Sequence, residues 1–148
     1  MSHQKIRLYK IKNHIKHFFH PYKEIDNFNY IKIRISGSIN SVKEYQIIKK
    51  ENKADISLFD IYYEDGKEKS TLKYNYQVEI KDILNLLNKC NIYSWDKFNK
   101  DKSKKISDGE QFNFVAVINS NIEINAAGNN AYPKHFHELI NQINNFLR

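Results

Sequence analysis

The stretch ADISLFDIYYEDGKEKSTLKYNYQVE, residues 54–79, decides the fold class because it predicts two strands joined by a tight turn. Its Asp65-Gly66 pair is typical of two-residue hairpin turns. Residues 54–63 are apolar on nearly both faces, which predicts a central strand. After the turn, apolar or aromatic side chains alternate with polar ones, the period of a half-buried strand. The alternating residues are Leu72, Tyr74, Tyr76 and Val78.

Further strands are predicted on both sides of this hairpin. Isoleucines alternate with polar residues over 31–35, up to the turn Ser36-Gly37-Ser38, and residues 42–50 can form the next strand. Later in the chain, residues 112–118 alternate in the same way, and residues 122–126 return after Asn119-Ser120-Asn121. We therefore expect a second hairpin there.

Two segments have helical spacing instead. Ile80, Ile83, Leu84, Leu87 and Cys90 predict a helix over about 79–91. The last segment carries apolar residues on one narrow face, and Pro133 occupies the position expected for its first helical residue. Residues 4–22 fit either a basic amphipathic helix or a strand, and the sequence leaves this choice open.

Strands followed by helices, with hairpin turns between the strands, indicate an α+β fold. We predict an antiparallel sheet of about six strands with two or three helices packed on one face, in a single domain over residues 1–148. The sheet face opposite the helices is expected to carry Tyr62 or Tyr63, and either Tyr74 and Tyr76 or their polar neighbours.

The C-terminal 40% of the chain resembles a known family. Over roughly residues 78–138, the segments VEIKDILNLLNKCNIYSWDKF, ISDGEQFNFVAVI and IEINAAGNNAYPKHFHEL resemble a family of small uncharacterised proteins (a domain of unknown function) from low-GC Gram-positive bacteria. The chain departs from the family pattern at Lys97, where glycine is usual, and at Tyr132, where phenylalanine is usual. The resemblance implies the fold and brings no established activity with it.

The connection IYSWDKFNKDKSKKISDGEQF, residues 92–112, is a candidate site. Trp95 and Phe98 are expected to cover the end of the preceding helix. The predicted structural framework of this region is Trp95, Phe98, Gly109, Phe112, Gly128 and Pro133. The same connection contains a candidate partner-binding loop with five lysines, Lys97, Lys100, Lys102, Lys104 and Lys105. Asp96, Asp101 and Asp108 largely offset their charge, so a structural connection is the main expectation and partner binding the second.

The net charge of +7 and the pI near 9.3 raise the question of a nucleic-acid partner. The chain has 21 lysines and only three arginines, whereas base-reading sites favour the planar fork of arginine. Lys, Asn, Ile and Tyr also share A/T-rich codons, so genome composition alone explains this profile. Non-specific attraction to phosphates remains open as an alternative function.

Catalytic and metal-binding patterns are weak in this sequence. Cys90 lies on the apolar face of a predicted helix, and four glycines are too few for a phosphate-binding loop. His14, His17 and His20 would point in different directions on a helix. We therefore predict that the protein is not an enzyme and holds no cofactor or metal. An enzyme with a site assembled from His14 or His17 with Asp60 is the third hypothesis.

The remaining evidence favours a non-catalytic protein-interaction module, such as an inhibitor, an immunity-type protein or a regulator. The single cysteine and the absence of a long apolar run predict a cytoplasmic protein without a membrane partner. The sequence predicts another protein as its partner, and it does not indicate an oligomeric state.

Overall fold

The computed structural model describes residues 23–37, 41–102 and 109–148. The segment 4–22, with its open choice between helix and strand, lies outside the described residues, and so do Lys104, Lys105 and Asp108 of the candidate loop.

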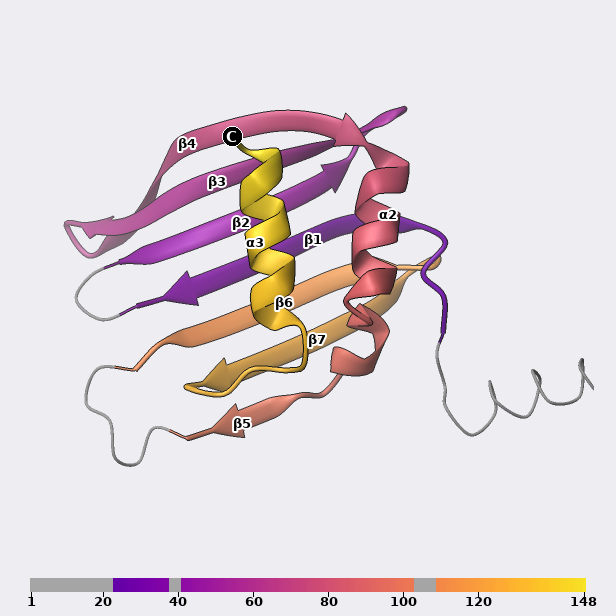
Figure 1. Ribbon diagram of the computed structural model, residues 1–148. Coiled ribbons are helices and arrows are strands. Elements are labelled where there is room, and N and C mark those ends of the chain that lie inside the picture. The colour runs from indigo at the N-terminus through magenta and orange to yellow at the C-terminus, as the bar shows by residue number, and fades with distance from the viewer. Residues whose placement is uncertain (1–22, 38–40, 103–108) are drawn as a thin grey trace, which may run out of the picture.

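Among the described residues, seven strands form one sheet with the order β4-β3-β2-β1-β6-β7-β5 (Figure 1). The strands are β1 (Phe28–Ser36), β2 (Val42–Lys49), β3 (Lys53–Glu64), β4 (Lys67–Glu79), β5 (Asn99–Asp101), β6 (Gln111–Ile118) and β7 (Ile122–Asn129). The hairpin that decided the fold class is β3–β4, and the second predicted hairpin is β6–β7.

The α+β class is confirmed, but the prediction of six antiparallel strands is wrong. The sheet is mixed because β5 runs parallel to β7 along the edge opposite β4. This strand has only three residues, Asn-Lys-Asp, which are too few and too polar to show a strand period. Its place is fixed by backbone hydrogen bonds: Lys97 and Lys102 donate to the carbonyls of Asn125 and Asn129, each at 2.8 Å.

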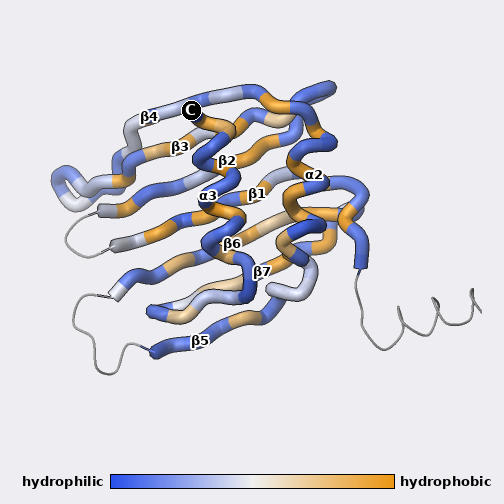
Figure 2. Tube along the Cα trace, in the orientation of Figure 1, coloured by the Kyte–Doolittle hydropathy of each residue, from blue (hydrophilic) through white to orange (hydrophobic). Residues whose placement is uncertain are grey.

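Two α-helices, α2 (Ile80–Lys89) and α3 (Phe136–Phe146), are present among the described residues, and both cover the same face of the sheet (Figure 1). Hydrophobic and hydrophilic residues alternate along both helices (Figure 2), and the buried ones include Ile83 and Leu87 of α2 and Leu139 and Ile143 of α3. A 3-10 turn, η1 (Ile92–Trp95), follows α2. Neither helix in this part of the chain is long and apolar enough to cross a membrane.

The predicted start of the last helix is wrong by three residues. Residue Pro133 lies before α3, and its carbonyl accepts a hydrogen bond from the Phe136 amide at 3.2 Å. Between them, His135 has a left-handed φ of 70°, which interrupts a regular helix. Residues 133–135 therefore form a turn before α3, although the sequence pattern assigns them to the helix.

The core lies between the sheet and the two helices. Alternate residues of adjacent strands meet there in register, as when Ile31 of β1 lies between Ile47 of β2 and Ala116 of β6. From the helix side, Ile83 and Leu87 of α2 and Leu139 and Ile143 of α3 are fully buried against these residues. This single buried layer explains why one face of each strand is apolar in the sequence.

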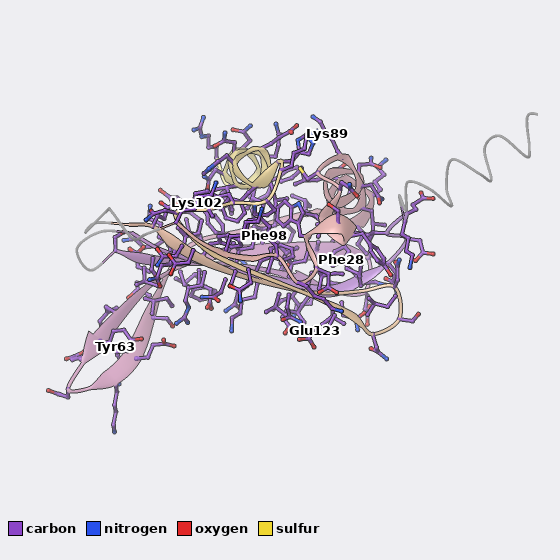
Figure 3. The ribbon with its side chains drawn as sticks, turned by 90° about the horizontal axis from the view of Figure 1, so that it is seen from below. Phe28, Tyr63, Lys89, Phe98, Lys102 and Glu123 are labelled. Atoms are coloured by element: carbon purple, nitrogen blue, oxygen red, sulfur yellow. The ribbon has the colours of Figure 1, made fainter. Side chains whose placement is uncertain are left out.

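The β3–β4 hairpin extends beyond its neighbours and bends away from the helices, as Figure 3 shows at Tyr63. A β-bulge between Leu58 and Phe59 shifts its register, and bulges increase local bending and twist. As a result, Ile61 is only 5% exposed although it lies on the sheet face without helices. We call that face the open face.

Candidate functional site

The predicted framework around Trp95 lies in the core of the molecule. The Trp95 side chain is 1% exposed and packs edge-on against Phe114, with ring centroids 5.0 Å apart. Its indole nitrogen donates a hydrogen bond of 3.0 Å to the carbonyl of Lys134. Trp95 thus joins η1, the sheet and the turn before α3, which is a structural position rather than an accessible binding site.

Other predicted framework residues pack near Trp95. The Phe98 ring lies 6.2 Å from that of Phe112, whose side chain covers Gly128 of β7. A Cβ atom at Gly128 would lie 2.0 Å from the Ala131 carbonyl oxygen and 2.5 Å from the Phe112 ring. Only glycine fits this position, because the chain folds back on itself directly after β7. Similarly, a Cβ at Gly109 would lie 2.3 Å from the Asn130 side chain.

The lysines of the candidate loop follow the β5 edge of the sheet. Lys100 is in β5, and its ammonium lies 5.4 Å from the centre of the Phe98 ring. Lys97 precedes the strand and Lys102 follows it. Asp96 is engaged nearby, because its carboxylate accepts a hydrogen bond of 3.0 Å from the Asn125 amide. These three lysines are exposed, and Lys97 and Lys100 each line a hollow beside β5, of about 400 and 250 Å³.

Lys97 itself occupies a strained turn. Its φ is 66°, a left-handed conformation that costs a residue with a Cβ about 1 kcal/mol and costs glycine little.

Replacing Lys97 with glycine is therefore expected to raise the free energy of unfolding by about 0.5 kcal/mol, after the extra chain entropy of glycine is subtracted. Urea unfolding of the purified variant measures this change. Lys100→Gly is the matched control, because its extended backbone in β5 gains nothing from glycine and should lose stability. A loss of stability in Lys97→Gly as large as in the control would contradict this reading of the turn.

The candidate catalytic groups are engaged in structural contacts. Cys90 is fully buried, and burial raises the pKa of its thiol to about 11, so it remains protonated. Asp60 lies 3.4 Å from Lys73, while His14 and His17 lie outside the described residues. Within the described ranges, no three His, Cys, Asp or Glu residues gather as metal ligands do.

The open face carries an ionic network that the sequence pattern does not predict. The Arg34 guanidinium of β1 lies 2.9 Å from Glu44 of β2 and 2.7 Å from Glu68 of β4. The β1 and β4 strands are three strand spacings apart, about 14 Å in a flat sheet. The curl of the β3–β4 hairpin brings Glu68 across this gap. The hydrogen bond to Arg34 lowers the pKa of Glu68 and raises that of the guanidinium.

Glu44 is the only charged side chain that is buried among the described residues, at 5% exposed, and Arg34 is its counter-ion. Replacing Arg34 with methionine should lower the free energy of unfolding by about 2 kcal/mol, because it leaves a buried carboxylate without its cation. Replacing both residues in Arg34→Met/Glu44→Met should restore most of this loss, since no buried unpaired charge remains and Glu68, the other partner of Arg34, is exposed to solvent. Chemical denaturation measures the free energy of unfolding of both variants. A double variant no more stable than Arg34→Met would contradict the prediction.

The β4 strand is the most exposed regular element of the described chain. Twelve of its thirteen residues are exposed, and no strand lies beyond it in the described sheet. The exposed fractions are 53% for Leu72, 57% for Tyr74 and 53% for Tyr76. Alternate residues of such an edge direct their amides and carbonyls outward, where another strand can pair with them.

The two tyrosines of β4 point to the helix side of the sheet, and the sequence had left their face open. Tyr74 and Tyr76 pair with Leu58 and Ile56, whose buried side chains face the helices. On the open face, Tyr63 is the member of the Tyr62–Tyr63 pair that lies opposite Glu68. The helices leave Tyr74 and Tyr76 uncovered because β4 is the outermost strand.

A groove accompanies the edge on its helix side. It holds a volume of about 430 Å³ between the end of α3 and strands β2–β4. Its lining consists of Lys43, Tyr45, Leu58, Tyr74, Asn144, Leu147 and Arg148. Tyr45 closes its floor with a hydrogen bond of 2.8 Å to Asn144. The groove is therefore apolar at its base, with a cationic side chain on each of two elements.

No known protein family, curated protein sequence or solved structure matches the chain.

Proposed function

We propose that this protein is a non-catalytic protein-interaction module, and that its partner docks along β4. The observation that carries the proposal is the free edge of β4, exposed in twelve of thirteen residues and bearing two tyrosines at 57% and 53% exposure. Sheet edges bind extended segments of other proteins through main-chain hydrogen bonds, and side-chain pockets then add specificity. Tyrosine is enriched in such interfaces.

Proteins that do not use an edge for binding protect it with charges, proline or bulges. In β4 these devices lie mainly on the hairpin side, at Lys67, Lys69, Lys73 and the bulge, whereas Glu79 at the other end is paired with Lys53. From Tyr74 to Val78 the strand carries no charge and no proline. This half is therefore the open part of the edge.

The distribution of lysines supports a protein partner over a nucleic acid. Lys97, Lys100 and Lys102 lie at the β5 edge, whereas Lys67 and Lys69 lie on β4 at the opposite end of the sheet. Among the described residues, these groups do not converge on one face, as a track for a phosphate backbone requires.

Affinity capture from lysate of the organism that makes the protein tests the proposal. The wild type is compared with Tyr74→Lys/Tyr76→Lys, before and after nuclease treatment. We expect a discrete protein that withstands nuclease, with at least tenfold less captured by the variant. The matched control is Tyr30→Lys/Ile48→Lys, which changes two residues on the open face that are 39% and 38% exposed.

Two results would overturn the proposal. One is capture of nucleic acid alone, lost with nuclease and reduced by orders of magnitude between low and moderate salt, as counterion release predicts. The other is failure to capture any protein at either salt concentration. A protein captured equally by wild type and variant would support an interaction module and reject β4 as its docking edge.

A further inference from the structure

The geometry points to an acidic, extended segment of the partner protein as the occupant of the β4 edge, where it adds an eighth strand to the sheet. This inference rests on the proposed interaction function and specifies the chemistry of the partner.

The charges beside β4 are the first argument. Lys67 and Lys69 have no ion-pair partner among the described residues, whereas both glutamates of the strand are already engaged. Glu68 binds Arg34, and Glu79 binds Lys53. Glu64 lies opposite Lys67 in the strand register and offsets one of these cations, but Lys69 lies opposite Tyr62, so its counter-charge has to come from elsewhere.

The groove adds two further cations on the same side. Lys43 and Arg148 line it together with Tyr74, and neither forms an ion pair within the described ranges. Asp60, the carboxylate of β3 nearest to this margin, is paired with Lys73 at 3.4 Å. Glu64 and Asp65 lie at the hairpin end beside Lys67 and offset its charge, whereas Lys69, Lys43 and Arg148 lie outside that turn. An incoming strand thus meets net positive charge along the helix side of the edge.

The apolar half of the edge defines the rest of the partner. A strand paired with Tyr74–Val78 places alternate side chains on the helix side, above Tyr74, Tyr76 and the groove. Aromatic or β-branched residues fit these positions, because the base of the groove is formed by Tyr45, Leu58 and Leu147. The segment is therefore apolar and alternating in one half and acidic in the other.

A second copy of this chain does not fit that description. The chain carries a net charge of +7, and an antiparallel pairing of the whole edge about its centre would place Lys73 of one copy opposite Lys73 of the other. Like charges across a strand pair are destabilising. The bulge also places Leu72 and Tyr74 on opposite faces, which interrupts a symmetric pairing of the whole edge.

Selection from a phage library of random twelve-residue peptides tests the inference with the full chain as bait. We expect selected peptides to contain Asp or Glu in one half and alternating aromatic or β-branched residues in the other. In NMR titrations with the strongest peptide, chemical-shift changes should concentrate on residues 67–79. Proline in place of alternate residues of the peptide should weaken binding at least tenfold, because proline lacks the amide that strand pairing needs.

Variants of the protein measure separately how the charges and the aromatic side chains of β4 contribute to peptide binding. Lys67→Glu/Lys69→Glu should weaken binding of the same peptide about tenfold, and Tyr74→Ala/Tyr76→Ala at least as much. The matched control for charge is Lys50→Glu/Lys134→Glu, which changes two exposed lysines away from β4 and should alter the affinity less than twofold.

Each contrary outcome has a definite meaning. Selected peptides without acidic enrichment, or no selected peptides, would overturn the inferred chemistry. Shift changes at another surface would overturn strand addition while leaving an interaction module in place. If a twenty-residue oligothymidine shifts the signals of residues 67–79, the edge binds nucleic acid instead. If sedimentation shows a concentration-dependent dimer through β4, the edge binds a second copy of the chain. Failure of the interaction function itself is detected separately, by the absence of any protein in the lysate capture.

Discussion

Replacing Trp95 with alanine is expected to lower the free energy of unfolding by about 4 kcal/mol, the range found when a large buried aromatic side chain is deleted. The indole is 1% exposed and touches Phe114 of β6 and Phe136 of α3, at centroid distances of 5.0 and 5.8 Å. Alanine would leave a cavity at the point where η1, the sheet and α3 meet. Urea unfolding, followed by far-ultraviolet circular dichroism, measures the loss.

Two variants control this prediction. Trp95→Phe keeps an aromatic ring and loses the hydrogen bond to the Lys134 carbonyl, so it should lose only about 1–2 kcal/mol. Tyr63→Ala, at a residue 67% exposed, should change stability by less than about 0.5 kcal/mol. A loss below about 1 kcal/mol in Trp95→Ala would mean that the tryptophan belongs to a solvent-exposed connection.

Replacing Gly128 with alanine is expected to lower the free energy of unfolding by about 3 kcal/mol, at the upper end for overpacked positions. The added Cβ would lie 2.0 Å from the Ala131 carbonyl oxygen. Because this neighbour is backbone, no side-chain rotation relieves the clash, and β7 or the turn after it has to move. The midpoint of thermal or urea unfolding measures the effect.

Gly66→Ala is the matched control for this prediction. Gly66 has a φ of +73° but no atom within 4 Å of the added Cβ, so its substitution tests backbone strain alone and should cost about 1 kcal/mol. Equal losses in the two variants would contradict a steric role for Gly128.

The fold follows from the sequence wherever a strand or helix is long enough to show its period. Alternation identified β4 and β6, and the apolar run at 54–63 identified β3. Strand β5 could not be found in this way, since three polar residues have no period and its position depends on pairing with β7, which follows it by more than 20 residues. The start of α3 was misplaced because the left-handed His135 leaves no signature beside Pro133.

The β4 edge could not be predicted from the sequence as the fold could. The five-lysine loop attracted attention through composition, and its role in partner binding stays a prediction. The exposed edge of β4 has the alternating pattern of a half-buried strand, so its sequence gives no sign that it is outermost. Only the strand order shows this, and strand order depends on contacts between distant segments. The contact between Arg34 and Glu68 has the same origin, because it needs the bulge and the curl of the hairpin.

The two edges of the sheet differ in a way that bears on function. The β5 edge is three residues long and entirely polar, which suits a protected end of a sheet. The β4 edge is thirteen residues long and includes an uncharged half with two exposed tyrosines. This asymmetry favours β4 as the surface where another protein binds, and the proposed function depends on it.

Hydrogen–deuterium exchange of the protein alone and in complex with its captured protein partner tests this dependence most directly. If the partner adds a strand to β4, the outward amides of residues 74–79 should exchange at least tenfold more slowly in the complex, while those of β5 remain unchanged. Exchange in β4 that is the same with and without the partner, together with new protection elsewhere, would show that the edge is not where the protein binds.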